Sequence, residues 1–252
     1  MGQTMSKTIL ITGASRGIGR SAALLAGQRG WSVGVNYAGN RSAADETVDL
    51  VTRAGGQAVA IRGDVASEAD VLAMFEETER AFGPLDGVVA NAGIVGPAQA
   101  LADMSVERMR RIFEVNVLGA YLCAREAARR LSRSRGGRGG SLVLVSSIAS
   151  RFGSPFEYVD YAGSKAAVDT LALGLSKELG PEGVRVNSLR PGVTETDIHA
   201  SGGQPDRAQR VGATTPFGRA GRPEEVAEAI VWLLSDASSY VSGALLDVSG
   251  GR

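Results

Sequence analysis

The chain has 252 residues, 44% of them hydrophobic, and its 27 Lys and Arg residues balance its 27 Asp and Glu residues. That length accommodates one α/β domain with a sizeable core, and the balanced charge favours neither a nucleic acid nor a membrane surface as partner. The single cysteine, Cys123, excludes an intramolecular disulfide and is expected to be a small buried hydrophobe. No apolar run reaches the ~18 residues of a membrane span, and residues 1–7 do not resemble a secretory signal, so we expect a cytoplasmic protein.

Seven short apolar segments have the pattern of strands that are covered on both faces. They are rich in Val, Ile and Leu and do not alternate with polar residues, which is typical of a parallel sheet. The predicted strands are residues 8–12, 32–37, 57–62, 85–90, 141–146, 184–189 and 245–248.

Longer segments with helical patterns separate these strands. Regular alternation of strands and helices predicts an α/β fold: a doubly wound Rossmann-type domain with a parallel seven-stranded sheet and helices on both faces. We expect a single domain over residues 1–252, with residues 1–6 disordered. The predicted helices are residues 17–29, 42–54, 68–82, 105–131, 158–179 and 223–234.

A glycine-rich turn joins the first predicted strand to the first predicted helix. It reads TGASRGIG over residues 12–19, with the spacing Gly-x-x-x-Gly-x-Gly. Glycines let a backbone turn tightly beside a pyrophosphate, and the following helix N-terminus offers free N–H groups and the positive end of the helix dipole. This position favours dinucleotide binding over an ordinary turn. The expected cofactor-binding residues of the turn are Gly13, Ser15, Arg16, Gly17, Ile18 and Gly19.

The end of the second predicted strand bears on the choice of cofactor. NAD-selective enzymes commonly place an acid there to bind the adenosine ribose, but this end reads Asn36-Tyr37-Ala38, without a carboxylate. Arg16 and Arg41 could instead hold a 2′-phosphate, because a guanidinium binds phosphate with two hydrogen bonds. The sequence therefore favours NADP(H), with NAD(H) as the alternative.

Two segments lack strand or helix patterns. The Arg- and Gly-rich segment 132–140 is expected to be a flexible solvated loop, with contact to a phosphate as the alternative. The longer segment 195–222 is expected to be a lid or substrate loop, since long loops in compact domains often are. It contains His199, the only histidine, which we expect at the surface or in the lining of the substrate loop. With one histidine and one cysteine, we expect no metal site.

Tyr161 and Lys165 are four residues apart on a predicted helix and therefore share one face. A tyrosine hydroxyl ionises near pH ~10, and a cation ~4 Å away in a partly shielded site is worth up to ~4 kcal/mol. At ~1.4 kcal/mol per pH unit, Lys165 is expected to lower the pKa of Tyr161 by up to ~3, towards the pH where acid–base catalysis is most efficient. Tyr158 is a rival, but Ala162 stands where its lysine would be, so we expect Tyr158 to pack or to line the substrate site.

The glycine turn and the Tyr-x-x-x-Lys pair together resemble the short-chain dehydrogenase/reductase family. Further matches follow in the same order: Asn91-Ala92-Gly93, Asn116 within NVLGAY, Ser146-Ser147 and Pro191-Gly192. The resemblance covers essentially the whole chain. The stretch SRFGSPFEYVDYAGSK is similar to that of bacterial glucose-dehydrogenase-like and 3-oxoacyl-reductase-like oxidoreductases.

The resemblance assigns catalytic roles to four residues. Tyr161 would exchange a proton with the substrate oxygen, and Lys165 would lower the Tyr161 pKa and bind the nicotinamide ribose. Ser147 would hydrogen-bond to the substrate oxygen, and Asn116 would hold a water that continues a proton relay. Two alternatives stay open, because the adjacent Ser146 could take the place of Ser147 and Asn116 could be a structural amide.

The resemblance also implies cofactor contacts after several strands. Asp64 and Val65 would flank the adenine, although Asp64 could instead cap the following helix. The segment after the sixth predicted strand would contact the nicotinamide carboxamide and the neighbouring phosphate. Beyond the glycine turn, the expected cofactor-binding residues are Asn36, Tyr37, Asp64, Val65, Asn91, Ala92, Gly93, Tyr161, Lys165, Pro191, Gly192, Val193, Thr194 and Thr196.

These features predict an NADP(H)-dependent oxidoreductase that transfers a hydride between nicotinamide C4 and a carbonyl or secondary alcohol. The alternatives are a non-catalytic NADP-binding regulator and an epimerase or dehydratase with the same fold. Sugars, small ketones and β-keto thioesters all stay open as substrates, because specificity depends on the loops. By resemblance we expect a homotetramer, with a dimer as the alternative, that pairs the two long helices and the last strand.

Overall fold

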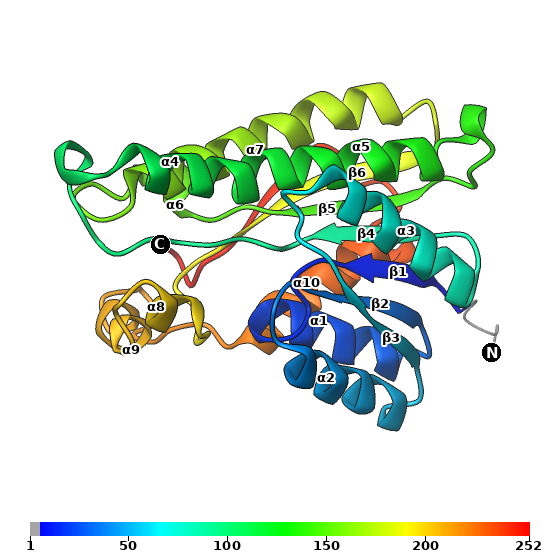
Figure 1. Cartoon of the computed structure of the whole chain (residues 1–252), viewed down its shortest axis with the longest axis horizontal. Helices are drawn as coiled ribbons and strands as arrows, with labels where there is room; N and C mark the ends of the chain where they lie inside the picture. Colours follow the sequence, from blue (N-terminus) through cyan, green and yellow to red (C-terminus); the bar gives the residue numbers. More distant parts are fainter. Residues whose placement is uncertain (1–5) are drawn as a thin grey trace.

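The computed structural model describes residues 6–252, and within them the chain forms a parallel sheet of seven strands in the order β3-β2-β1-β4-β5-β6-β7. Every neighbouring pair of strands is parallel. This confirms the predicted doubly wound Rossmann-type fold, and Figure 1 shows helices on both faces of the sheet. The strands are β1 (Thr8–Ile11), β2 (Ser32–Tyr37), β3 (Gln57–Arg62), β4 (Gly87–Ala90), β5 (Gly140–Val145), β6 (Val184–Pro191) and β7 (Leu245–Val248).

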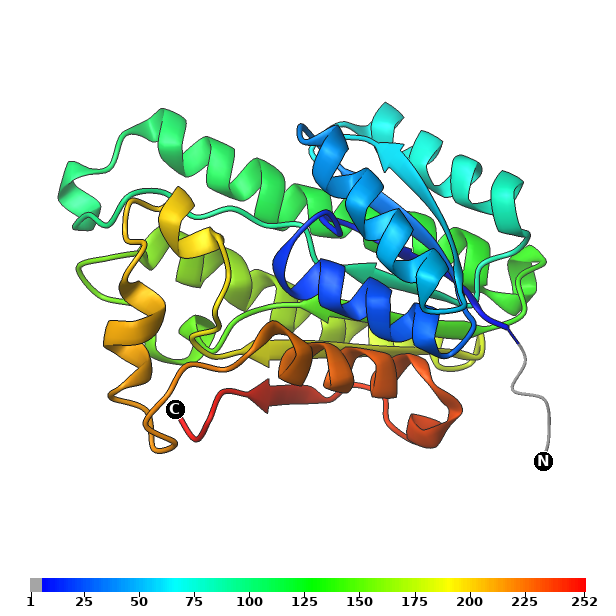
Figure 2. The ribbon, with the colours of Figure 1, turned by 90° about the horizontal axis from the view of Figure 1, so that it is seen from below.

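The apolar strands separate two hydrophobic cores. Neighbouring side chains of a strand point to opposite faces, so Ile9 and Ile11 join one core while Leu10 joins the other. The first core lies under α1, α2 and α10 and the second under α3, α5 and α7, as Figures 1 and 2 show from two directions. The longer helices are α1 (Gly17–Gln28), α2 (Arg41–Arg53), α3 (Glu68–Phe82), α4 (Val106–Phe113), α5 (Gly119–Leu131), α7 (Val159–Leu179) and α10 (Pro223–Leu234).

Two expectations about the helices need correction. The single helix predicted over residues 105–131 consists of α4 and α5 joined by a π-helical turn at Glu114–Leu118, and Asn116 lies in that turn. The segment 195–222 is not without structure, because it contains α8 (Ile198–Ser201) and α9 (Arg207–Gly212). Both helices lie beyond the carboxyl ends of the strands, at the left in Figure 1. Another short helix, α6 (Ala149–Phe152), follows β5 and was also not predicted.

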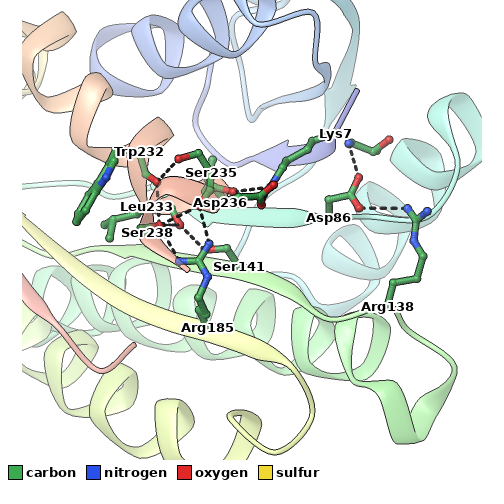
Figure 3. A network of polar contacts seen from close by, with 12 residues as sticks. Lys7, Asp86, Arg138, Ser141, Arg185, Trp232, Leu233, Ser235, Asp236 and Ser238 are labelled. Carbon is green, nitrogen blue, oxygen red and sulfur yellow. Dashed lines mark hydrogen bonds and ion pairs between the residues drawn. The ribbon is translucent and has the colours of Figure 1, made fainter. Parts of the chain in front are cut away.

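A polar network fastens the amino ends of the strands to the end of α10 (Figure 3). Lys7 forms an ion pair with Asp236 at 2.7 Å, and Arg185 donates to the buried Ser238 hydroxyl at 2.9 Å and to the Ser235 carbonyl at 3.1 Å. Asp86 accepts a hydrogen bond from the backbone N–H that opens β1. The network holds this end of the sheet and leaves the opposite end to the loops.

The segment 132–140 belongs to the same end of the molecule, since it runs into the start of β5. It contains a 3-10 turn at Arg133–Arg135, the backbone N–H of Ser134 donates to Glu182 at 2.8 Å, and Arg138 pairs with Asp86 at 3.2 Å. It is therefore tied to neighbouring segments, and the phosphate contact considered as its alternative role is not supported by its position.

The expected disorder of residues 1–6 falls mostly on residues 1–5, which lie outside the described residues. Ser6 is described, and its hydroxyl donates to the Gly30 carbonyl at 2.9 Å. Over residues 6–252, the helices are all too short or too polar to cross a lipid bilayer.

Candidate active site

A cavity of about 510 Å³ extends along the carboxyl ends of strands β1 to β6. Each of these strands contributes the segment that follows it, and ligands of open parallel sheets bind at this edge. Most of the predicted site residues line the cavity, although Gly19 and Asn116 do not. Those that do are Gly13, Ser15, Arg16, Gly17, Ile18, Asn36, Tyr37, Asp64, Val65, Asn91, Ala92, Gly93, Ser147, Tyr161, Lys165, Pro191, Gly192, Val193, Thr194 and Thr196.

The glycine turn leaves the start of α1 open to the cavity. No side chain caps the first turn of this helix, so its free N–H groups and dipole can meet an anion. Gly13 has a φ of +62°, in the left-handed region that favours glycine. Gly19 serves packing, because a Cβ there would lie 2.5 Å from the Gly13 carbonyl oxygen. Asn91 fixes the turn from the side, donating to the carbonyls of Thr12 and Gly13 at 2.8 and 3.1 Å.

The end of β2 is held by the buried side chain of Asn36. Its Oδ1 accepts from the Gly13 N–H at 3.0 Å, and its Nδ2 donates to the Gly63 carbonyl at 3.0 Å. Asn36 thus ties the glycine turn to β3, and its polar atoms are already engaged. Arg16 is exposed at the rim of the cavity, and among residues 6–252 its guanidinium has no hydrogen-bond or ion-pair partner. Arg41, in contrast, is paired with Asp45 at 2.9 Å.

Asp64 does not cap α3, so that alternative is wrong. Ser67 caps this helix by accepting from the Asp70 N–H, whereas Asp64 accepts from the Ala66 N–H at 3.0 Å. Asp64 also pairs with Arg111 at 2.9 Å, and these bonds hold the pKa of its carboxyl below the ordinary value, the backbone bond having the larger effect. Arg111 lines the cavity and was not predicted, since nothing in the sequence distinguishes it from other arginines of α4.

Helix α7 brings Tyr161 and Lys165 into the cavity beside the end of β5. The Lys165 ammonium donates to the Val145 carbonyl at 2.8 Å and lies 5.8 Å from the centroid of the Tyr161 ring. The Ser147 side chain lines the same cavity and lowers the pKa of the Tyr161 hydroxyl. The Ser146 hydroxyl instead donates to the Lys165 carbonyl at 2.9 Å. Between the two serines, the geometry favours Ser147 as the one available to a ligand.

The pKa of Tyr161 is raised, in the direction opposite to the predicted one. Burial of the hydroxyl has the largest effect, and the hydrogen bond from Ser147 and then the charge of Arg207 lower the pKa in part. The Lys165 ammonium is directed to the Val145 carbonyl. Burial lowers the pKa of Lys165 itself to about 8, although Asp169 acts in the opposite direction. The sequence could not predict this balance, because it depends on how deeply both groups are buried.

Asn116 lies behind the cavity wall, within the π-helical turn. Its Oδ1 accepts from the Ile94 N–H at 2.8 Å, and its Nδ2 donates to the Ile94 carbonyl at 2.9 Å and to Ser164 at 3.1 Å. A Cβ on Gly93 would lie 3.2 Å from the Lys165 ammonium and 3.4 Å from Asn116 Oδ1, so all three are packed together. These contacts engage the polar atoms of Asn116 and place its side chain beside Gly93 and Lys165.

The remaining part of the cavity is closed by residues of α6, α7, α8 and α9. Tyr158 lines it as expected, and its hydroxyl accepts from Gln204 at 3.0 Å. His199 also lines it, with its ring nitrogen 2.8 Å from the Thr194 carbonyl oxygen, so its expected place at the surface is wrong and the alternative is right. Phe152, Arg207 and Arg252 line the cavity too, and no sequence pattern singled them out.

Comparisons with known proteins give matches over nearly the whole chain. The family model described as enoyl-(acyl carrier protein) reductase matches residues 13–252. The uncharacterized oxidoreductase YgfF of Escherichia coli (strain K12) is 50% identical over 243 residues, 96% of this chain and 98% of that protein. L-rhamnose 1-dehydrogenase (NAD(P)(+)) of Sphingomonas sp. (strain SKA58) is 40% identical, over 97% of this chain and 95% of that protein. The crystal structure of a short-chain type dehydrogenase/reductase from Mycobacterium marinum is 35% identical and matches with a TM-score of 0.91, over 99% of this chain and 96% of that one.

Proposed function

The chain is an oxidoreductase of the short-chain dehydrogenase/reductase family, and on that premise we propose that it uses NADP(H) to interconvert a carbonyl and a secondary alcohol, with Tyr161 as general acid and base. The observation that carries the proposal is that one cavity contains both the glycine turn with its uncapped helix and the group formed by Ser147, Tyr161 and Lys165. An anion site and a proton donor in one cavity suit a dinucleotide and its substrate.

The residues of the cavity fit a dinucleotide. The open start of α1 would hold the pyrophosphate, and a Cβ at Gly17 would lie 3.2 Å from the Thr196 side chain, so a larger residue would narrow this passage. Asp64 and Val65, which line the cavity, would flank the adenine, and the segment after β6 would contact the nicotinamide. When bound, the cofactor supplies or accepts the hydride at C4 of its nicotinamide.

The protein's own residues handle the proton. Tyr161 is protonated at neutral pH, and burial raises its pKa further above the ordinary value. It can therefore donate a proton to a carbonyl oxygen, or accept one from an alcohol when it is ionised. Ser147 would hydrogen-bond to the same oxygen, and Lys165 would hold a ribose hydroxyl and stabilise the ionised tyrosine. Asn116 would hold a water that continues the proton relay.

The preference for NADP(H) rests on Arg16. Among the described residues its guanidinium has no protein partner, and no carboxylate follows β2 to bind a ribose diol. Asn36 has its polar atoms engaged by backbone, and Arg41 is paired with Asp45. Arg16 is therefore the cation that we propose binds the 2′-phosphate.

NADPH should bind more tightly than NADH, and Arg16→Ala should weaken NADPH binding by about 10- to 100-fold while leaving NADH binding unchanged, because a hydrogen-bonded charge pair is worth about 1.5–3 kcal/mol. The measurement is a fluorescence titration of both nucleotides. Arg53→Ala removes an exposed arginine of α2 that lies outside the cavity lining, so it is the matched control. If neither nucleotide binds, the proposed function fails; tighter binding of NADH would leave the fold and chemistry in place but refute the role of Arg16.

Carbonyl reduction should slow as the pH rises through about 8, because the Lys165 ammonium has its pKa lowered to about 8 by burial and loses its charge above it. The pKa of Tyr161 is raised, so Tyr161 stays protonated over the same range. The measurement is kcat/KM for reduction between about pH 6 and about pH 10. Lys165→Arg keeps its charge throughout and should move the descending limb to higher pH. If the descending limb of the pH profile stays at the same pH in Lys165→Arg, a group other than Lys165 is responsible for it.

Two other functions share the fold. A non-catalytic NADP-binding regulator would have no need of the assembled Ser147, Tyr161 and Lys165, and an epimerase or dehydratase would give no net change in nicotinamide absorbance. Measured turnover of NADPH with a carbonyl substrate would exclude both. The substrate is a small molecule under this proposal, and we place the enzyme in the cytoplasm.

We further propose that the chain is one domain and assembles as a homotetramer, with a dimer as the alternative. Large apolar side chains are exposed on the faces that the family resemblance pairs: Phe113, Leu118 and Tyr121 near α4 and α5, and Tyr240 before β7. Symmetric pairing of such faces would remove them from water.

A further inference from the structure

The part of the cavity lined by α8 and α9 contains a buried arginine, Arg207. Its carboxylate partner, Glu157, binds only one edge of the guanidinium. Arg207 of α9 is 9% exposed, and its Nη1 lies 2.7 Å from Glu157 Oε1. Among residues 6–252, Nε and Nη2 of Arg207 have no hydrogen-bond partner. No fully buried side-chain nitrogen or oxygen of these residues lacks a partner, so both atoms keep some exposure, and Arg207 lines the cavity.

A second arginine adds positive charge at the same place. Arg252 lines the cavity, and its guanidinium carbon lies 4.9 Å from the centroid of the Phe152 ring. Arg207 lowers the pKa of Arg252 after the effect of burial, while Glu157 raises it, so the three charges lie within electrostatic reach of one another. Arg207 and Arg252 therefore place two guanidinium groups near the Glu157 carboxylate at this end of the cavity.

Asp197 and His199 also line the cavity, and neither pairs with Arg207. Asp197 is exposed and directly follows Thr196. The Thr196 side chain lies beside Gly17 of the glycine turn, so Asp197 lies near the proposed pyrophosphate site. His199 has its pKa lowered by burial and is neutral at pH 7. The buried guanidinium of Arg207, held by Glu157 at Nη1 alone, is thus suited to bind an anionic group with its other edge.

Arg207 is also close enough to Tyr161 for its charge to lower the pKa of that hydroxyl. The guanidinium is stacked over the Tyr158 ring at 4.9 Å and is held by Glu157, so its free edge has a fixed direction. A planar fork of this kind binds a carboxylate with two parallel hydrogen bonds. A molecule held at Arg207 would present a carbonyl several bonds away to Tyr161.

We propose that Arg207 is a specificity-determining residue that binds a carboxylate of the substrate, with Arg252 as a second cation, so that the enzyme acts on oxo acids and the corresponding hydroxy acids. This rests on the proposed function for the reaction itself. Glu157 is a positioning residue in this assignment, since it holds Nη1 and leaves the other edge of the guanidinium to the substrate.

The test uses paired probes that differ only in charge: 3-oxobutanoate, 4-oxopentanoate and 5-oxohexanoate, each beside its methyl ester. NADPH binding is measured first, so that failure of the proposed function is seen separately. Binding of the probes is then measured by calorimetry with and without NADP⁺, and kcat and KM by NADPH oxidation. At least one oxo acid should be preferred over its ester by about tenfold or more, and Arg207→Gln should raise its KM by about 10- to 100-fold without changing the ester, as expected for one charged hydrogen-bonded contact.

Two variants keep the result interpretable. Arg210→Gln removes the same charge from the same helix outside the cavity lining and should change the preference by less than about twofold. Arg207→Lys keeps the positive charge but lacks the planar guanidinium, so it should retain part of the preference for the acid over its ester. This variant also tests the proposal if Arg207→Gln does not fold. The proposal is overturned if the esters, or neutral sugars such as L-rhamnose, bind and react as well as the acids. A preference that persists in Arg207→Gln overturns it equally.

Discussion

Tyr161→Phe should lower kcat for carbonyl reduction by about 10²- to 10⁴-fold, the range that a positioned general acid contributes. Tyr161 lines the cavity and is engaged by Ser147, and its raised pKa keeps the proton available at neutral pH. Phenylalanine has nearly the same shape, so the packing of α7 and the binding of NADPH should change little. The loss should therefore appear in kcat and not in the affinity for the nucleotide.

The measurement combines steady-state kinetics with a fluorescence titration of NADPH on the same variant. Tyr158→Phe is the matched control, because Tyr158 is a tyrosine of the same cavity whose hydroxyl contacts Gln204 and not Ser147. Tyr158→Phe should lower kcat by less than about tenfold, which is the effect expected from the loss of one neutral hydrogen bond. If Tyr158→Phe abolishes turnover and Tyr161→Phe does not, the assignment of the two tyrosines is reversed.

The fold was predictable because its central strands are buried on both faces. In the segments 9–11 and 142–145, side chains are apolar on both sides to reach the two cores, and this leaves uninterrupted apolar runs that no amphipathic helix shows. The glycine turn was predictable for a different reason: the positive φ of Gly13 and the close approach at Gly19 restrict these positions to glycine. Such local constraints can be recognised in one sequence.

The substrate end was not predictable, because its residues come from short helices without a periodic pattern. Arg207 is one of several arginines between residues 195 and 222, and only the fold shows that it is buried while Arg210 is exposed. The pKa of Tyr161 was predicted in the wrong direction for a related reason. The spacing of Tyr161 and Lys165 indicates that they share a helix face, but not that burial outweighs the nearby cation.

Arg108→Leu should lower the free energy of unfolding by about 3–5 kcal/mol, because it leaves the carboxylate of Asp160 buried without a partner. The two side chains are only 11% and 1% exposed, and they meet through Nε–Oδ2 at 2.9 Å and Nη2–Oδ1 at 3.2 Å. Arg108 also binds Gln99 at 2.8 Å, so it links α4, the segment after β4 and the start of α7. For a protein of this size the melting temperature should fall by about 6–20 °C.

The ion pair also bears on the reaction, since Asp160 precedes Tyr161 and its Oδ1 accepts from the Tyr161 N–H at 2.8 Å. Thermal and denaturant unfolding of three variants separates the effects. The double variant Arg108→Leu with Asp160→Asn should regain much of the stability, because no unpaired charge remains. Arg53→Leu breaks a pair that is 76% and 66% exposed and should cost less than about 1 kcal/mol. If Arg108→Leu lowers the free energy of unfolding no more than Arg53→Leu does, Asp160 must be solvated in the variant. The ion pair of Arg108 and Asp160 would then not be what fixes the start of α7 beside Tyr161.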